Sequence, residues 1–354
     1  MHTDPTSLRL RFLAILGALP LAACGGERFE SEACISVADP TAECPTVAEA
    51  AADLVGVGCG TAIVSVDGEG VFTGADEDTG FAGDRCCYPV TRKEVNNGCV
   101  VGRPYYEGGQ LVMAPAVRTS GWAGGRRPSV AGLSAEERRV LADAWTQDAL
   151  IEHASVAAFA RFALELMAFG APAELVDAAF AAGRDEVRHA RLTFALAEAY
   201  AGAPVAPAAF PFGGAIPLER DLAALAAATA REGCIGETVV ALLAAEALAA
   251  TEDPAAREVL AVIAADETRH AELAWKAVRW MIEAGDERVR AAVAAVFEDV
   301  AQNGVTPPDV TFGAPDGVLA AHGRIRPEAM RSMVDRALAE VVAPCGLAAT
   351  RKAA

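Results

Sequence analysis

From residue 133 onward, apolar residues recur at the three-to-four-residue spacing of helices that bury one face. Capping residues, glycines and prolines divide this region into segments. Ser134 followed by Glu137 has the form of a capping box, and Asp253-Pro254 has the form of a cap with proline in the first helical turn. The pattern therefore predicts helices at about 134–169, 172–201, 218–250, 254–283, 287–302 and 327–342.

The spacing of the breaks predicts how the first four helices are connected. The first pair and the second pair are joined by short turns, which make neighbouring helices antiparallel. Between the pairs lies the segment 203–217, fifteen residues with four prolines. An extended chain of that length reaches about 50 Å, enough to travel the length of a bundle. We therefore expect an all-α four-helix bundle over 133–284, with a long crossover between helices two and three and a helical extension over 285–354.

The N-terminal part has a different composition and is rich in glycine, cysteine, aspartate and threonine. Alternating residues over 61–74, with Asp-Gly-Glu-Gly in the middle, predict a β-hairpin. We interpret 24–117 as a small, partly β, disulfide-rich module and 118–132 as a linker. The module holds six cysteines besides the one at its start, and six allow 15 pairings. They are Cys34, Cys44, Cys59, Cys86, Cys87 and Cys99.

The alternative for these cysteines, a zinc site, is disfavoured because the module has no Cys-x-x-Cys pair and no nearby histidine. Two further cysteines, Cys234 and Cys345, stand far apart in the helical region. A disulfide between them would fasten the C-terminal tail to helix three. The other interpretation is that each is a small apolar residue with a free thiol.

The first residues have the basic flank and short apolar run of a secretory signal. The run ends in Leu-Ala-Ala-Cys, which resembles the lipobox of bacterial lipoproteins, in which the cysteine carries lipid. The resemblance implies a signal peptide over 1–23, a lipid anchor on Cys24 and, because no aspartate follows, location at the outer membrane of the bacterial cell envelope. An ordinary signal with a chance cysteine is the alternative. No later segment is expected to span the membrane, so the anchor would be lipid alone.

The net charge limits the classes of molecule that the chain is expected to bind. The chain carries a formal charge of −18 at pH 7 and a sequence pI near 4.7. Nucleic-acid binding needs a basic face, so this class of partner is not expected.

Two of the five histidines stand in one repeated phrase, Asp-Glu-Val-Arg-His-Ala at 185–190 and Asp-Glu-Thr-Arg-His-Ala at 266–271. Glutamate and histidine three residues apart share a helix face and can bind one metal ion. Helices one and three must then supply matching carboxylates. Glu152 has the right depth in helix one; in helix three Glu237 does, whereas Glu232 would be about 10 Å too far from the turn and Glu246 too close to it. The candidate metal ligands are Glu152, Glu186, His189, Glu237, Glu267 and His270.

This series over 134–283 resembles the ferritin-like di-iron carboxylate superfamily. The stretches 152–162 and 231–238 also look like ferritin-like lipoproteins of soil bacteria. The resemblance implies two iron or manganese ions per chain. The phrase is similar to that of bacterial multicomponent monooxygenases, which implies that Asp185 and Asp266 orient the histidines. Arg188 and Arg269 would brace the same carboxylates.

Two departures limit what the resemblance implies about chemistry. Thr193 stands where ribonucleotide reductase small subunits carry their radical tyrosine, and Ala241 stands where the monooxygenases carry a threonine. We expect an exported oxidoreductase that reacts with O2 or peroxide. The alternatives are a ferroxidase that handles iron, and a metal-free ferritin-like lipoprotein with a binding or structural role. An exported enzyme has no evident cytosolic reductase, which weakens the monooxygenase interpretation.

Overall fold

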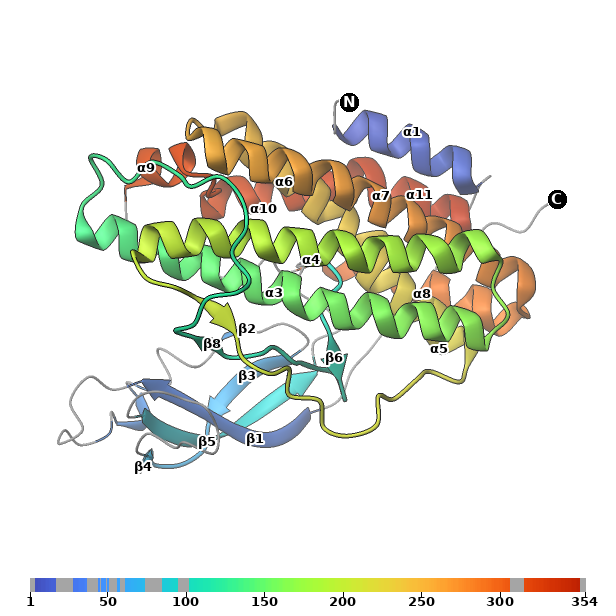
Figure 1. Cartoon of the computed structure of the whole chain (residues 1–354). Coiled ribbons are helices and arrows are strands. Elements are labelled where there is room, and N and C mark those ends of the chain that lie inside the picture. Colours follow the sequence, from blue (N-terminus) through green and yellow to red (C-terminus); the bar gives the residue numbers. More distant parts are fainter. Residues whose placement is uncertain are drawn as a thin grey trace. The chain divides into compact units, whose positions relative to one another are not determined.

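The computed structural model describes residues 4–16, 28–36, 44, 46–48, 50, 56–57, 61–73, 85–94, 102–305 and 315–350, which are mostly helical with few strands (Figure 1). The chain divides into two compact units. One comprises Gly25–Cys99, and the other comprises Met1–Cys24 together with Val100–Ala354. The boundary after residue 99 lies eighteen residues before the predicted end of the cysteine-rich module at 117, because the segment from Val100 onward packs with the helices.

The smaller unit contains an antiparallel sheet built on its longest strand, β5. β1 pairs along one edge of β5, and β3 and β4 share the other edge. The predicted hairpin is therefore wrong, because its two halves pair with β5 and follow one another along it. The strands are β1 (Arg28–Ser36), β2 (Gly56–Val57), β3 (Thr61–Val66), β4 (Val71–Thr73) and β5 (Arg85–Glu94).

The Asp-Gly-Glu-Gly segment makes an irregular passage between β3 and β4. The backbone N–H of Asp67 donates to the carbonyl of Pro89 at 2.8 Å, which continues the pairing with β5. A Cβ at Gly68 would lie 2.8 Å from Pro89, and one at Gly70 would lie 2.5 Å from the Tyr88 ring. The glycines are thus needed because the chain passes close to β5. They do not form the tight turn of a hairpin that the sequence pattern predicted.

One disulfide is described in this unit, between Cys44 and Cys86. The other predicted cysteines of the module cannot be placed in pairs. The side chains of Cys34 and Cys87, and all of Cys24, Cys59 and Cys99, lie outside the described residues.

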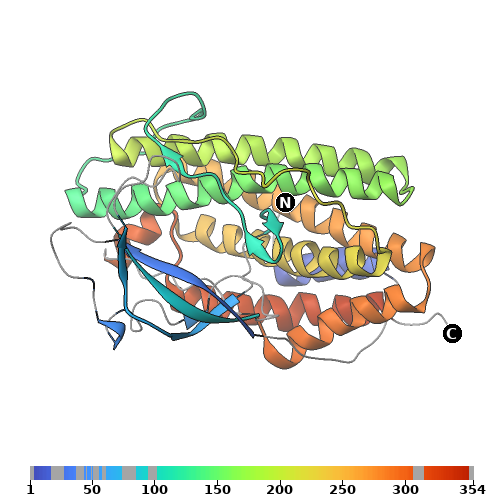
Figure 2. The ribbon, with the colours of Figure 1, turned by 90° about the horizontal axis from the view of Figure 1, so that it is seen from below.

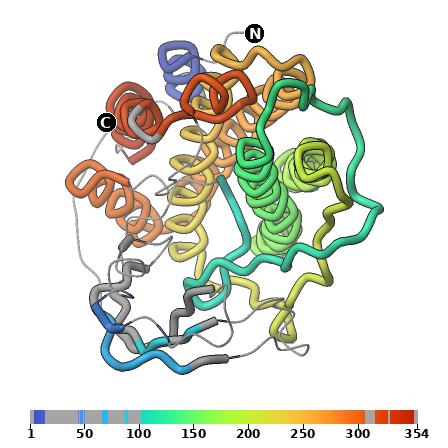
Figure 3. The backbone as a smooth tube through the Cα atoms, turned by 90° about the vertical axis from the view of Figure 1, so that its left-hand side faces the viewer, coloured from blue at the N-terminus to red at the C-terminus, as the bar shows by residue number. Residues whose placement is uncertain are grey.

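The larger unit is built on four long helical segments that run alongside one another, as Figures 2 and 3 show from below and along the helices. α3 and α4 pack along their length, and α7 packs against α4 and the third segment. The third segment is continuous but has three parts. The bounds are α3 (Ala135–Ala168), α4 (Ala173–Ala201), α5 (Leu222–Thr229), the π-helical η1 (Ala230–Glu237), α6 (Thr238–Ala250) and α7 (Pro254–Ala284).

The predicted boundaries of the first five helices are close to those of the structure, because capping residues define most of them, whereas the last predicted helix, 327–342, continues to Ala349. Ser134 and Glu137 form the expected capping box, and the Asp253 side chain accepts from the first backbone N–H groups of α7. α5 begins four residues later than predicted. Its cap is Asp221, whose carboxylate accepts from the backbone N–H of Ala223 at 3.0 Å.

The predicted linker and the crossover are both bound to the helices. Strand β8 (Ala116–Val117), just before the linker, pairs with β9 (Ala206–Pro207) in the crossover, and β6 (Tyr106–Glu107) pairs with β7 (Gln110–Leu111). The N–H of Gly124 donates to the carbonyl of Arg191 in α4 at 3.0 Å. The linker is thus held on α4 by a backbone hydrogen bond.

The first residues form α1 (Pro5–Leu16), where a signal peptide is predicted. Leu8 and Phe12 are buried, and the Phe12 ring stacks on Trp275 of α7 at 5.6 Å. Within the described residues, the helical segment Leu222–Ala250 is long and apolar enough to cross a membrane, although most of it is buried among its neighbours. This test concerns length and composition alone, so the expectation that no later segment spans the membrane stays a prediction.

Beyond α7 the chain continues as α8 (Glu287–Asn303), α9 (Asp316–Ala321), α10 (Pro327–Ala337), the π-helical η2 (Leu338–Val342) and α11 (Ala343–Ala349). Cys234 and Cys345 are both buried free thiols, so the predicted disulfide between them is not formed. Both belong to the same apolar core cluster, and burial raises the pKa of each thiol. They fit the alternative interpretation, small apolar residues that fill the core.

Two glycines in η1 allow its neighbours to approach closely. A Cβ at Gly233 would lie 2.4 Å from the Cβ of Ala274 in α7, and a Cβ at Gly236 would lie 2.6 Å from the carbonyl oxygen of Gly102. Such separations are far below van der Waals contact. The glycines therefore set how closely α7 and the segment around Gly102 pack on this helix.

This packing predicts opposite effects for two glycine-to-alanine changes within helices. Gly233→Ala should lower the free energy of unfolding by about 1–3 kcal/mol through overpacking. Gly183→Ala in α4 is the matched control, because its Cβ would meet only the Cβ of Phe159 at 3.5 Å. It should raise stability by about 0.5–1 kcal/mol through helix propensity. Chemical denaturation of the metal-free protein measures both; equal effects would contradict the close-packing argument.

Candidate metal centre

The two copies of the repeated phrase face one another across the α4–α7 contact. Nδ1 of His189 lies 3.6 Å from Glu186 in its own helix and 3.4 Å from Glu267 in α7. Nδ1 of His270 lies 3.1 Å from Glu267 in its own helix and 3.1 Å from Glu186 in α4. Each of these glutamates therefore reaches both imidazoles, one with each carboxylate oxygen.

The other two predicted ligands complete two groups of donor atoms. Glu152 of α3 lies 3.3 Å from Nδ1 of His189, and Glu237, the last residue of η1, is near Glu267 and His270. Within each group, one donor atom from every residue lies within 4.8 Å of the others. The groups share one glutamate and consist of Glu152, Glu186, His189 and Glu267, and of Glu237, Glu267 and His270.

The far nitrogen of each imidazole faces the aspartate of the opposite helix. Nε2 of His189 lies 2.9 Å from Asp266, and Nε2 of His270 lies 3.6 Å from Asp185. When each Nε2 carries the proton, Nδ1 presents its lone pair to the carboxylates. The aspartates are therefore placed to set the tautomer and ring orientation of a metal-binding histidine.

The two arginines of the phrase join the two aspartates into a closed network. Arg188 contacts Asp185 at 2.9 Å and also contacts Asp266. Arg269 lies 2.7 Å from each of the same aspartates. Two positive and two negative charges thus alternate at the outer side of the centre. This network fixes α4 to α7 at the level of the histidines.

Burial and charge oppose one another at the inner carboxylates. Burial raises the pKa of Glu152 and of Glu237 well above the ordinary value. Burial alone would lower the pKa of His189, but the charge of Glu152 and the other acidic groups raises it well above the ordinary value. The same holds for His270 beside Glu267. Without a cation, the centre therefore retains protons on these groups.

The donor set fits a metal ion better than it fits a hydrogen-bonded cluster. One carboxylate oxygen each of Glu186 and Glu237 is buried without a hydrogen-bond partner among the described residues. Unpaired buried carboxylate oxygens are costly, and carboxylate with imidazole is a donor set suited to iron, manganese or zinc. These buried groups could hold a metal ion.

Two glutamates that the sequence analysis excluded as metal ligands, Glu232 and Glu246, lie away from the centre. Glu246 is exposed on α6. Glu232 lines a separate pocket with Arg161 and Glu165.

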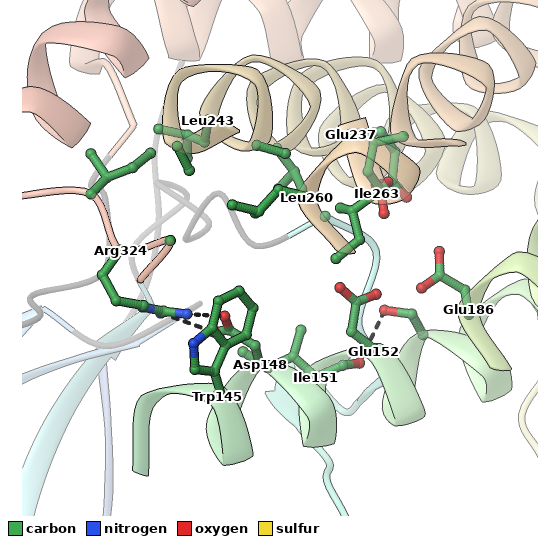
Figure 4. A pocket seen from close by; sticks show the side chains of 18 of the residues that line it. Trp145, Asp148, Ile151, Glu152, Glu186, Glu237, Leu243, Leu260, Ile263 and Arg324 are labelled. Atoms are coloured by element: carbon green, nitrogen blue, oxygen red, sulfur yellow. Dashed lines mark hydrogen bonds and ion pairs between the residues drawn. The ribbon is translucent and has the colours of Figure 1, made fainter. Parts of the chain in front are cut away.

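A cavity of about 180 Å³ adjoins the centre (Figure 4). Four of its lining residues are the glutamates of the centre, and aliphatic side chains of α3, α6 and α7 form the walls. At the other end, Trp145 and Asp148 of α3 meet Arg324, whose guanidinium stacks over the indole ring at 4.8 Å. The apolar wall residues include Ile151, Val240, Leu243, Leu260 and Ile263.

Sequence reasoning missed the residues that close the cavity and cover the centre. Gly102 lies so close to Glu237 that a Cβ there would be 3.0 Å from its carboxylate. Arg103 beside it is buried, with its guanidinium 4.0 Å from the centre of the Phe162 ring. Arg324 comes from the loop after α9. Only the paired glycines of η1 gave a signal of close approach, and no sequence pattern linked these distant segments to the site.

Comparison with protein-family models, with curated proteins and with solved structures gave no match. The assignment of this centre therefore depends on its own geometry and chemistry.

The retained protons predict pH-dependent metal binding. Since groups with a raised pKa must lose protons before they bind a cation, Mn(II) binding should release protons at pH 7, and affinity should rise with pH. Calorimetric titration in two buffers of different ionisation enthalpy measures the release. Glu246→Gln, at an exposed position, should leave it unchanged. A binding heat that is independent of the buffer would contradict the proton displacement.

Proposed function

We propose that this chain is an exported carboxylate-bridged protein with two iron or manganese ions, an oxidoreductase that reacts with O2 or peroxide. The observation that carries the proposal is the pair of donor groups sharing Glu267, set against one end of an apolar cavity. Four glutamates provide four negative charges, which two divalent ions would balance. The two aspartates of the phrase are already balanced by its two arginines.

The roles of the residues follow from their positions. Glu152, Glu186 and His189 would hold one ion, Glu237 and His270 would hold the other, and Glu267 would contribute to both. When bound, such a pair supplies two electrons for the reduction of O2 or peroxide. Asp266 would hold the proton of His189 at Nε2 and so keep its Nδ1 free for the metal, and Asp185, 3.6 Å from Nε2 of His270, would favour the same tautomer there.

The surroundings of the centre limit access by water. Phe159 packs against His270 with ring centroids 5.0 Å apart, and aliphatic residues form the cavity walls. Charged groups interact more strongly where water is excluded. A small apolar molecule could occupy the cavity beside the glutamates. This feature favours an organic substrate over the alternative function, a ferroxidase whose only substrate is Fe(II).

The arrangement of the helices supports a ferritin-like bundle as the scaffold of this centre. α3 and α4 form one antiparallel pair, the third segment and α7 form the other, and residues 202–221 connect them. Each pair supplies one glutamate from its first helix and a Glu-x-x-His from its second. A metal-free structural role is a further alternative. Elemental analysis of the protein distinguishes this role from a metal-binding function.

The first test is the metal content of the full-length protein. After anaerobic loading with Fe(II) or Mn(II) and removal of excess metal, elemental analysis should give close to two ions per chain. Glu186→Ala or His270→Ala should lower the metal content sharply, because each change removes a metal ligand. Asp185→Ala should weaken binding about 10–100-fold, as expected of a residue that orients a ligand.

Glu232→Ala is the control, because Glu232 lies in the same helical segment but lines another pocket. Its metal content should equal that of the wild type, and circular dichroism should show that all variants remain helical. A folded wild type that binds neither ion would contradict the proposal.

A second test concerns export and anchoring, which we infer from the sequence of the first residues. Metabolic labelling with a radioactive fatty acid should mark the wild-type chain and not Cys24→Ser. Cys34→Ser, another cysteine of the exported part, should still be labelled. Label on the Cys24 variant would exclude this residue as the anchor.

A further inference from the structure

The cavity beside the centre has two chemically different ends (Figure 4). The glutamates form one end. The other is formed by the ion pair between Arg324 and Asp148, with the guanidinium stacked on Trp145. Between them the walls are aliphatic. A molecule that fits this cavity must have an apolar body, and its polar group belongs at the Arg324 end, because carboxylates at the other end repel an anion.

The two partners of the ion pair are held to different degrees. The Arg324 side chain is 13% exposed, whereas that of Asp148 is 34% exposed. Arg324 is fixed by the indole ring beneath it, while Asp148 lies on the α3 surface and can turn toward solvent. Asp148 pairs with the guanidinium through both of its oxygens, so an incoming carboxylate that displaces it can make the same two-point interaction. Bidentate pairing with a carboxylate is the interaction that arginine makes best.

The indole N–H of Trp145 adds a second feature at the same end. Trp145 is 1% exposed, and its Nε1 has no hydrogen-bond partner among the described residues. A buried donor without a partner is uncommon in a folded protein. Both groups that identify this end of the cavity, the guanidinium and the indole, are donors, so an acceptor group suits it.

Helix geometry and volume limit the size of the molecule. Asp148 and Glu152 are one turn apart on α3 and Trp145 and Glu152 two turns, so the ends of the cavity are separated by about 6–10 Å along the helix. A cavity of about 150 Å³ accepts benzene, so the 180 Å³ here suits ~6–8 non-hydrogen atoms.

We infer that this cavity binds a small aliphatic monocarboxylate of about six carbons, with its carboxylate on Arg324 and its hydrocarbon end against the glutamate centre. Arg324 is then the residue that determines specificity. The carbon furthest from the carboxylate is the one presented to the centre. That this molecule is the substrate rests on the proposed function, whereas its binding does not.

Binding is tested on the chelator-treated, metal-free full-length chain, by calorimetric titration with hexanoate, hexan-1-ol and hexylamine. Hexanoate should bind most tightly. Arg324→Gln should weaken hexanoate binding at least tenfold and leave hexanol binding nearly unchanged, since a hydrogen-bonded ion pair contributes about a factor of 10–100. Arg326→Gln is the matched control, because Arg326 forms an exposed ion pair with Asp316 in the same part of the chain.

A second variant separates recognition from folding. Asp148→Asn removes the competing carboxylate and should tighten hexanoate binding, whereas loss of a merely structural ion pair would weaken it. Leu260→Phe should block all three compounds by filling the cavity. The inference is overturned if hexanol binds as tightly as hexanoate, if Arg324→Gln retains the wild-type affinity, or if no compound binds. Metal content is measured separately, so hexanoate binding to a chain that takes up no metal would refute the proposed function alone.

Discussion

The enclosure of four glutamates in one small volume is the constraint on which the rest of the larger unit depends. Carboxylates buried at this separation cannot all remain ionised unless positive charge is placed among them. Among the residues that the structure describes, the ion pairs of Glu152, Glu186 and Glu267 are made with the two imidazoles. The two arginines of the repeated phrase lie outside these groups, on the aspartates. A bound metal ion would provide such compensation, and binding one requires the helices to hold the donors at a fixed separation.

Ion pairs, helix caps and close packing together hold the donors of the centre at a fixed separation. The Asp–Arg network joins α4 to α7 at the level of the histidines, and capping residues set where each helix begins. The π-helical turn at η1 shifts Glu237 relative to a regular helix, and single-turn π segments are frequent at functional sites. Gly233 lets α7 approach that turn closely. The position of the fourth glutamate is therefore decided by tertiary packing as well as by helical period.

Sequence reasoning could predict the parts of this structure that depend on local signals. The helix limits followed from caps such as Ser134, and Glu237 was preferred over Glu232 by counting residues to the turn. The prediction of a β-hairpin was wrong because Gly68 and Gly70 allow the chain to pack closely against a strand that is distant in the sequence. Arg324 was missed for a similar reason: it reaches Asp148 from 176 residues away, and no local pattern records such a contact.

The cavity and the ligands lie on the same helix faces, which explains why the sequence pattern alone could not distinguish a cavity wall from core. On each contributing helix the wall residues and the glutamate recur every three or four positions, the spacing of an ordinary buried stripe. What changes along the stripe is the size of the gap, because helices held apart by four facing glutamates do not close fully over the adjacent turns. Space beside the centre is thus a consequence of the centre itself, and side chains at its far end determine what can occupy it. The stripes are 145, 148, 152 and 155 on α3, 237, 240, 244 and 247 on η1 and α6, and 260, 263 and 267 on α7.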